Sequence, residues 1–286
     1  MSTDARAARG LRPRSLIVSV YGAYARETGG WMSVAVLVRL LGDLGVDETA
    51  VRSSVSRLKR RGLLLQERRD GAVGYVVSTQ LRDILAAGDR RIFGGEPAEL
   101  RDGWVLVVFS VPESERSSRH RLRSGLAGLG LGTVAPGMWI GPAHLVDDVR
   151  SALERLGLAS YAELFCGHHV AFDEVRTRVD RWWDLEDLQA QYGAYVDAWS
   201  PVLASWRRRR SVPAATAFAD YVGTLTAWRR LAYLDPGLPA EVLPAPWQGA
   251  RAAEVFFRLR DLLEDAAHAH VLETSGRRAL VTATVT

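Results

Sequence analysis

Residues 33–77 constrain the fold most, because they begin with two predicted short helices that are joined by a tight turn. The apolar run 34–41 predicts the first helix. Asp47 is a candidate N-cap for a second helix over about 48–61, because its carboxylate can accept a hydrogen bond from an otherwise unpaired backbone N–H. Gly62 follows, and glycine tolerates the left-handed conformation that often ends a helix. The segment therefore predicts a helix-turn-helix.

Two apolar runs follow the second helix. Residues 63–65 and 75–77 predict short strands, and a polar reversal over 68–74, which begins with Arg68 and Arg69, joins them. A helix-turn-helix followed by a two-stranded wing is the order of elements in a winged-helix DNA-binding domain.

The two faces of the second helix differ in chemistry. One stripe is apolar or small and is expected to be buried: Val51, Ser54, Val55 and Leu58. The opposite face carries six candidate DNA contacts: Thr49, Arg52, Ser53, Ser56, Arg57 and Arg60. Arginine forks match guanine acceptors, and small hydroxyl residues allow close approach to phosphates and base edges. An ordinary amphipathic surface helix would more often mix acids with bases, whereas no acid occurs between Glu48 and Glu67. We expect Arg68 and Arg69 of the wing to contact the backbone or the minor groove.

Charge is segregated along the chain. Residues 1–92 hold 16 Lys and Arg against 9 Asp and Glu, a net charge of +7, whereas the whole chain is +4 and the remainder is therefore −3. A basic N-terminal part attached to a nearly neutral body concentrates attraction for phosphate where the second helix lies.

The length of 286 residues predicts two or three domains. No apolar run reaches the roughly 20 residues needed to cross a bilayer, and the Arg-rich N-terminus lacks the apolar segment of a signal peptide. Cys166 is the single cysteine of the chain, which excludes an internal disulfide and fits a reducing cytoplasm. These features favour a cytoplasmic protein without a membrane partner.

The first domain is expected over 14–95, after a flexible arm over 1–13. Helices are predicted over 14–26 and 80–92, the second with Thr79 as a candidate cap. They would pack around the helix-turn-helix.

The middle of the chain opens with a dense β-branched run, 104–111, which predicts a buried strand. Two helices and three more strands are then predicted in the order β-α-β-β-α-β, over 113–126, 130–134, 138–140, 143–156 and 160–166. This order predicts a ferredoxin-like domain over 100–180. We interpret it as a dimerisation scaffold.

From Asp184, a candidate N-cap, the chain becomes helical. The first helix carries a broad apolar stripe: Leu185, Leu188, Tyr192, Tyr195, Val196, Trp199, Val202 and Leu203. Further helices are predicted over 214–232 and 249–272. The prediction is thus an α+β protein: a winged helix-turn-helix, a ferredoxin-like domain, and a helical effector or dimerisation domain over 181–273, with a tail over 274–286.

Together these residues resemble the phenylacetic-acid degradation repressor family, often called PaaX-like. The segments that carry the resemblance are 13–17, 21–22, 29–31, 50–58, 91–94, 135–140, 182–185, 234–239 and 243–247, among them Gly29-Gly30-Trp31 and Ala135-Pro136-Gly137-Met138-Trp139-Ile140. The resemblance implies a bacterial transcriptional repressor whose effector class is an aryl-acetyl coenzyme A thioester, with no cofactor.

A coenzyme A-responsive repressor needs groups that hold phosphates and an aryl group. The Arg207–Arg210 run is usually a solvated loop, but guanidinium forks match phosphate oxygens. Four candidate effector contacts are Arg207, Arg208, Trp228 and Arg229.

The middle domain also resembles the small CRISPR-adaptation nucleases, which carry a metal-binding acid at the end of the first strand. Ser110 stands there in this chain, and a serine hydroxyl cannot supply the negative oxygen that Mg²⁺ prefers. Cys166, His168 and His169 are read as strand-end or loop residues rather than metal ligands, because adjacent strand residues point to opposite faces. No catalytic or metal residue is predicted, and the chain is not expected to be an enzyme.

The expected function is that of a homodimeric, sequence-specific DNA-binding regulator, a repressor acting on a pseudo-palindromic double-stranded operator. An aryl-acyl-CoA effector would release it by binding its states unequally. Two alternatives are a metal-dependent nuclease that uses the middle domain and a DNA-binding protein that responds to no ligand.

Overall fold

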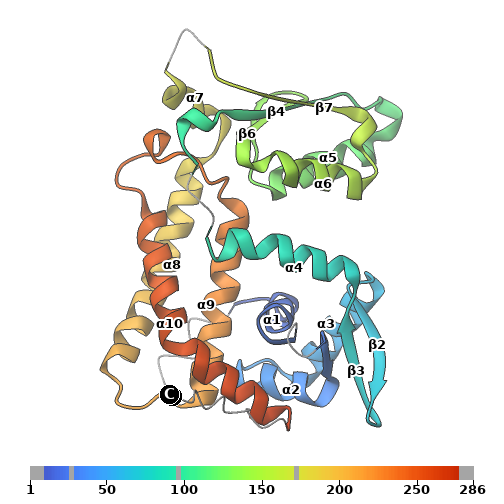
Figure 1. Ribbon diagram of the computed structural model, residues 1–286, viewed down its shortest axis with the longest axis vertical. Coiled ribbons are helices and arrows are strands. Elements are labelled where there is room, and N and C mark those ends of the chain that lie inside the picture. The colour runs from blue at the N-terminus through green and yellow to red at the C-terminus, as the bar shows by residue number, and fades with distance from the viewer. Residues whose placement is uncertain (1–9, 26–28, 95–97, 171–173, 277–286) are drawn as a thin grey trace, which may run out of the picture. The chain divides into compact units, whose positions relative to one another are not determined.

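The computed structural model describes residues 10–25, 29–94, 98–170 and 174–276. The chain packs as two compact units (Figure 1). Unit 1 contains residues 1–86, 194–228 and 250–286, and unit 2 contains 87–193 and 229–249. Each unit combines separate stretches of the sequence, so the division does not test the domain bounds expected from the sequence, which stay predictions. Most of the expected N-terminal arm and C-terminal tail lies outside the described residues.

The N-terminal elements of unit 1 follow the expected order. They are α1 (Pro13–Val20) with a π-helical turn (Tyr21–Ala25), β1 (Trp31–Ser33), α2 (Val34–Asp43), α3 (Glu48–Arg60), β2 (Leu64–Arg69), β3 (Ala72–Val77) and α4 (Thr79–Ile92), whose last residues belong to unit 2. The strands form an antiparallel sheet in the order β1-β3-β2. The sequence did not predict β1, because three residues are too few to show a periodic pattern.

Local capping explains where the helices begin and end. Ser33 Oγ accepts a hydrogen bond from Val36 N at 3.2 Å at the start of α2. Asp47 Oδ1 accepts one from Ala50 N at 2.9 Å, which confirms the predicted cap of α3. Gly62 has φ of +68°, as expected for a helix end. Ser78 caps α4 by accepting from Leu81 N at 3.2 Å, so the prediction that Thr79 caps it was wrong.

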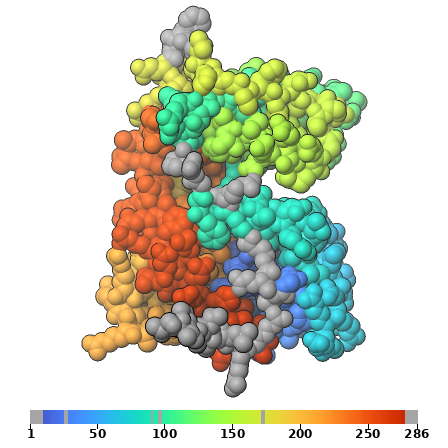
Figure 2. Space-filling view, viewed as in Figure 1, coloured from blue at the N-terminus to red at the C-terminus, as the bar shows by residue number. Residues whose placement is uncertain are grey.

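The hairpin expected to form the wing is longer than the sequence predicted. Instead of two three-residue strands and a seven-residue reversal, β2 and β3 pair over six residues each, from Leu64↔Val77 to Arg69↔Ala72. The turn consists of Asp70 and Gly71, both with positive φ, which continue the strand twist into a tight hairpin. Arg68 and Arg69 therefore lie on β2 rather than in a loop. In the ribbon the two strands run side by side at one margin of unit 1, and the space-filling view shows the residues of this colour at the same margin (Figures 1 and 2).

The core of unit 1 joins the N-terminal helices to the C-terminal ones. Helices α8 (Leu185–Arg208), α9 (Ala214–Leu234) and α10 (Gln248–Thr274) contribute residues 194–208, 214–228 and 250–274 to it. The fully buried side chains include Leu16, Ile17, Leu37, Leu40, Val51, Leu58, Phe218, Val222, Phe256 and Leu259. Each such burial contributes about 1.5–3 kcal/mol of transfer free energy. The expected apolar stripe of α8 is buried throughout.

Unit 2 is built on a four-stranded antiparallel sheet. Its elements are β4 (Trp104–Phe109), α5 (Arg116–Gly128), β5 (Gly132–Ala135), β6 (Met138–Pro142), α6 (Val146–Leu156) and β7 (Ala162–Gly167), with short 3₁₀ turns at 100–102, 113–115, 143–145, 159–161 and 240–242. The strand order is β5-β6-β4-β7. This β-α-β-β-α-β unit and the helical C-terminal region confirm the expected α+β layout.

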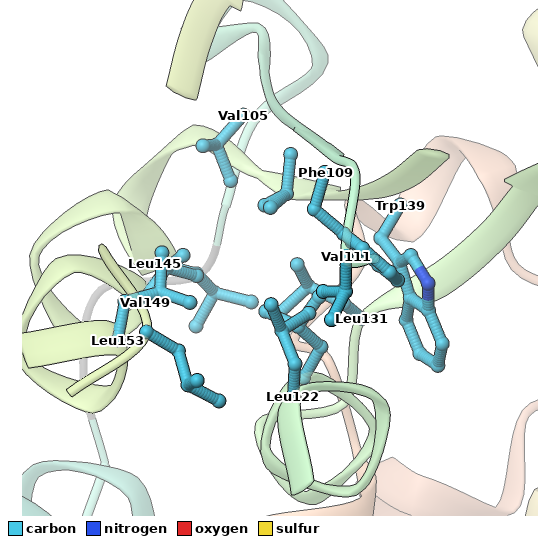
Figure 3. Packing of buried hydrophobic residues seen from close by; sticks show 12 residues of the cluster. Val105, Phe109, Val111, Leu122, Leu131, Trp139, Leu145, Val149 and Leu153 are labelled. Atoms are coloured by element: carbon cyan, nitrogen blue, oxygen red, sulfur yellow. The ribbon is translucent and has the colours of Figure 1, made fainter. Parts of the chain in front are cut away.

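Alternation along β4 gives this sheet two different faces. Val105, Val107 and Phe109 point toward α5 and α6 and form one core with residues such as Leu122, Leu131, Trp139, Leu145, Val149 and Leu153 (Figure 3). Trp104 lies on the opposite face, against α7 (Val175–Trp182), a helix that the sequence did not predict.

None of the helices in the described part of the chain has the length and apolar character needed to cross a membrane.

Candidate nucleic-acid interface

The exposed face of α3 carries the six residues expected to contact DNA. Thr49, Arg52, Ser53, Ser56, Arg57 and Arg60 are all exposed. The buried stripe is also as expected, with Val51, Ser54, Val55 and Leu58 at 3% exposure or less. Thr49, Ser53, Ser56 and Arg60 are spaced at intervals of four, three and four residues, so they lie along one line on the helix. We call this line the central stripe of α3.

The remaining basic side chains of α3 lie beside the central stripe. Arg52 Nε donates to Glu48 Oε1 at 2.6 Å, and both side chains are well exposed, so this pair contributes at most about 1 kcal/mol. Lys59 Nζ donates to Gln66 Oε1 of β2 at 2.7 Å. Arg57 Nη2 donates to Ser54 Oγ at 3.4 Å, which holds its guanidinium toward the buried side of the helix. Arg57 thus belongs to the edge of α3 rather than to its most exposed line.

The two wing arginines have different surroundings. Arg68 is exposed and donates to the carbonyl oxygen of Gly71 at 3.3 Å, beside the turn. Arg69 Nε donates to Glu67 Oε1 at 2.6 Å, and its guanidinium lies 5.5 Å from the ring centroid of Trp31. Arg68 is the more available of the two for a phosphate, whereas Arg69 is engaged in packing the wing against β1.

Three of the four candidate effector residues, Arg207, Arg208 and Trp228, belong to unit 1 and do not come together there. Trp228 is buried, stacked on Phe256 with centroids 5.2 Å apart and 5.9 Å from Tyr195. Arg207 and Arg208 are exposed at the end of α8, twelve residues beyond Tyr195, which is about 18 Å along a helix. Trp228 is a core residue of unit 1.

Burial lowers the pKa of Arg229, the fourth of these candidates, a half-buried side chain of unit 2.

A groove on the open face of the unit 2 sheet was not predicted. Its volume is about 620 Å³, and it is lined by Trp104, Leu106, Val134, Ile140, Phe165, Cys166, Gly167, His168, His169, Val170, Arg178, Arg181 and Trp182. His169 packs edge-on against Trp182 at 5.5 Å, and Phe165 is 55% exposed. We call it the aromatic groove. The only sequence signal for the groove is that Trp104 and Leu106 are two residues apart and therefore share one face of their strand. The sequence predicted that both faces of this strand are buried, so the signal was not used.

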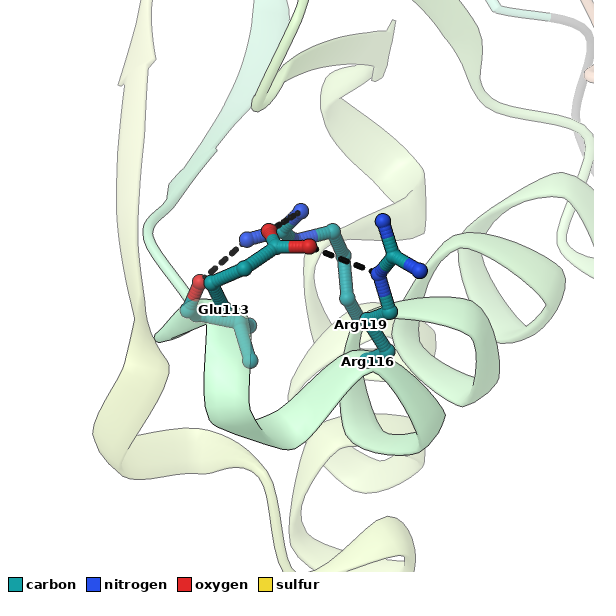
Figure 4. A network of polar contacts seen from close by, with 4 residues as sticks. Glu113, Arg116 and Arg119 are labelled. Atoms are coloured by element: carbon teal, nitrogen blue, oxygen red, sulfur yellow. Dashed lines mark hydrogen bonds and ion pairs between the residues drawn. The ribbon is translucent and has the colours of Figure 1, made fainter.

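Ser110 lies in a separate hollow of unit 2, of about 470 Å³, whose lining includes Arg119 and Arg123 but no carboxylate. The next acid along the chain, Glu113, is already hydrogen-bonded to two arginines. Arg116 Nε and Arg119 Nη1 donate to its two carboxylate oxygens at 2.6 and 2.8 Å (Figure 4). These hydrogen bonds lower the pKa of Glu113. The hollow is cationic, which is the opposite of what a Mg²⁺ site requires.

Comparison with known proteins covers most of the chain. Three family models match: PaaX-like protein over residues 12–81, PaaX protein central Cas2-like domain over 97–179, and PaaX-like protein C-terminal domain over 183–273. The chain is 26% identical over 263 residues to transcriptional repressor PaaX of Escherichia coli (strain K12), covering 91% of this chain and 83% of that protein.

A solved structure shares the fold. Uncharacterized protein Rv0674 from Mycobacterium tuberculosis aligns with a TM-score of 0.51 and 20% identity, covering 87% of this chain and 99% of that one. The three family matches lie in the order expected of the resemblance noted in the sequence. The chain belongs to the PaaX-like family.

Proposed function

We propose that this protein is a sequence-specific DNA-binding transcriptional regulator, and specifically a repressor. The observation that carries the proposal is α3: a capped helix whose exposed side holds hydroxyl residues and arginines, with no acid after its first turn. We assign residues 31–77 to a winged helix-turn-helix with α3 in the major groove and β2-β3 as the wing. The relative named as a transcriptional repressor supports this function. It also agrees with the expectation that the chain is not an enzyme.

The repressor would act as a homodimer on a pseudo-palindromic operator. A two-fold axis places two copies of α3 against two half-sites, so the half-site separation is set by the dimer geometry, at about one helical turn or a multiple of it.

The effector proposed is an aryl-acyl-CoA thioester. Because Trp228 is a core residue, we assign the acyl group to the aromatic groove instead. The groove combines apolar walls with Arg178 and Arg181, which suits a ligand with an aryl group and phosphates. Such a ligand releases DNA only if it binds the DNA-free state more tightly.

The nuclease alternative is disfavoured by the arginines around Ser110. The alternative of a regulator that responds to no ligand is distinguished from ours by titration with the thioester.

Fluorescence anisotropy on a labelled duplex from the protein's own upstream DNA, at fixed salt, tests both the binding and its release. We expect tight binding that phenylacetyl-CoA reverses and free coenzyme A does not. Binding unaffected by the thioester would overturn the effector, and weak binding that only follows ionic strength would overturn the sequence-specific reader.

A further inference from the structure

A hollow of about 510 Å³ lies between the start of α1 and the second half of α3. Seven residues line it: Arg12, Pro13, Arg14, Ser54, Arg57, Arg60 and Arg61. Five of the seven are arginines, and the lining includes no acid. We call it the arginine hollow. Arg57 and Arg60 are among the expected DNA contacts, but nothing in the sequence shows that the segment of Arg12 and Arg14 meets α3.

The positive charge of the arginine hollow is not neutralised within the part of the chain that the structure describes. Arg12, Arg14, Arg60 and Arg61 form no ion pair with any described carboxylate. The nearest acids along α3 are already used, since Asp47 caps the helix and Glu48 pairs with Arg52. Several guanidinium groups around one hollow repel one another, and an anion placed among them relieves that repulsion.

The backbone adds to this preference for an anion. Pro13 is the first residue of α1, and Arg12 at the N-cap provides no side-chain hydrogen bond to the helix. Ser15 N and Leu16 N both donate to the carbonyl oxygen of Arg12, at 2.8 and 3.2 Å, so this turn contributes the positive end of the helix dipole beside the hollow.

The hollow borders the surface assigned to DNA. Arg57 and Arg61 are four residues apart and lie on the same edge of α3, the edge that faces α1. Arg60 lies both in the hollow and on the central stripe. When a helix enters the major groove, the sugar-phosphate backbone passes along its edges, so the hollow would meet phosphates rather than bases.

We propose that the arginine hollow is a clamp for a backbone phosphodiester of the operator, formed by the N-terminus of α1 together with Arg57 and Arg61. This inference rests on the proposed function. The clamp fixes the position of α3 and raises affinity for all sequences, whereas the central stripe discriminates between sequences.

The test compares Arg14→Gln and Arg61→Gln with Arg82→Gln, an exposed arginine of α4 in the same unit that lies outside both the hollow and the surface assigned to DNA. Binding to an operator duplex and to a scrambled duplex is measured by anisotropy over a range of salt. For each hollow variant we expect the slope of log K against log salt to become shallower by about 0.9, which means about fivefold weaker binding at 0.15 M salt. The loss should be equal for both duplexes, and Arg82→Gln should keep the slope of the unaltered protein.

Two outcomes separate the clamp from the function. If the unaltered protein binds neither duplex, the proposed function fails. If it binds the operator specifically but the hollow variants keep its slope, or Arg82→Gln makes the slope equally shallow, the clamp is overturned and the function stands. Should a Gln variant unfold, as judged by circular dichroism, Arg14→Lys and Arg61→Lys replace it. These keep the charge but lose the bidentate fork, so we expect a retained slope with weaker binding, and unchanged affinity would contradict the clamp.

Discussion

Ser19 Oγ of α1 and Thr226 Oγ1 of α9 are hydrogen-bonded at 2.8 Å, although the two residues are 207 positions apart in the chain. Both side chains are buried. Ser19 lies on the helix that packs against α3, so this bond connects the proposed DNA-reading segment to the C-terminal helices within one unit. A shift of α9 must therefore either carry α1 with it or break a buried hydrogen bond.

Thr226→Val should destabilise unit 1 by about 1–3 kcal/mol, because it keeps the side-chain shape but leaves the buried Ser19 hydroxyl without this partner. The free energy of unfolding in urea measures the cost. Ser19→Ala alone should also destabilise, but the double variant should lose less than the sum of the two. Strict additivity would show that the two hydroxyls are not coupled.

The N-cap of α3 gives a second prediction. Asp47→Ala removes the acceptor for Ala50 N and should cost about 0.5–2 kcal/mol of folding free energy. Asp47→Asn keeps an acceptor oxygen and is the matched control. Since α3 is the proposed reading helix, the alanine variant should also bind the operator more weakly. Equal stability of the two variants would mean that the cap contributes nothing measurable.

The wing arginines should separate binding from stability. Arg68→Gln should weaken operator binding without lowering the melting temperature, because Arg68 is exposed and bonds only to a carbonyl oxygen. Arg69→Gln loses the Glu67 pair and the contact with Trp31, and should lower stability, by less than about 1 kcal/mol because the pair is partly solvated. Thermal unfolding and anisotropy on both variants decide the matter. If Arg68→Gln lowered the melting temperature and Arg69→Gln alone weakened operator binding, the roles given to the two arginines would be wrong.

The parts of the site that the sequence predicted are those with strong local signals. Helix α3 was predictable with its cap and its end because Asp47, a period of 3.6 residues and Gly62 all act within one segment. The length of the wing was not, because residues 66–69 are all polar and their pairing depends on the Asp70-Gly71 turn geometry. Trp228 could not be assigned either, since an aromatic residue on a helix shows the same pattern in a core as in a pocket.

The arginine hollow and the aromatic groove show a more general reason. The arginine hollow joins residues 12–14 to residues 54–61, and the aromatic groove joins four strands to an unpredicted helix. Both depend on which segments pack together, and no local pattern encodes that. The β-α-β-β-α-β order, by contrast, selects a known sheet topology, so the strand order of unit 2 followed from the order of the elements.

The aromatic groove gives the last prediction. Arg181→Gln should weaken the release of DNA by phenylacetyl-CoA while leaving operator affinity unchanged, because Arg181 lines the groove of unit 2, whereas α3 belongs to unit 1. Arg176→Gln is the matched control, as Arg176 is exposed on the same helix and lies outside the groove lining. The concentration of thioester needed for half-release, measured by anisotropy, should rise for the first variant alone. If instead Arg207→Gln raises it and Arg181→Gln does not, the phosphates bind at the end of α8 and the groove has another role.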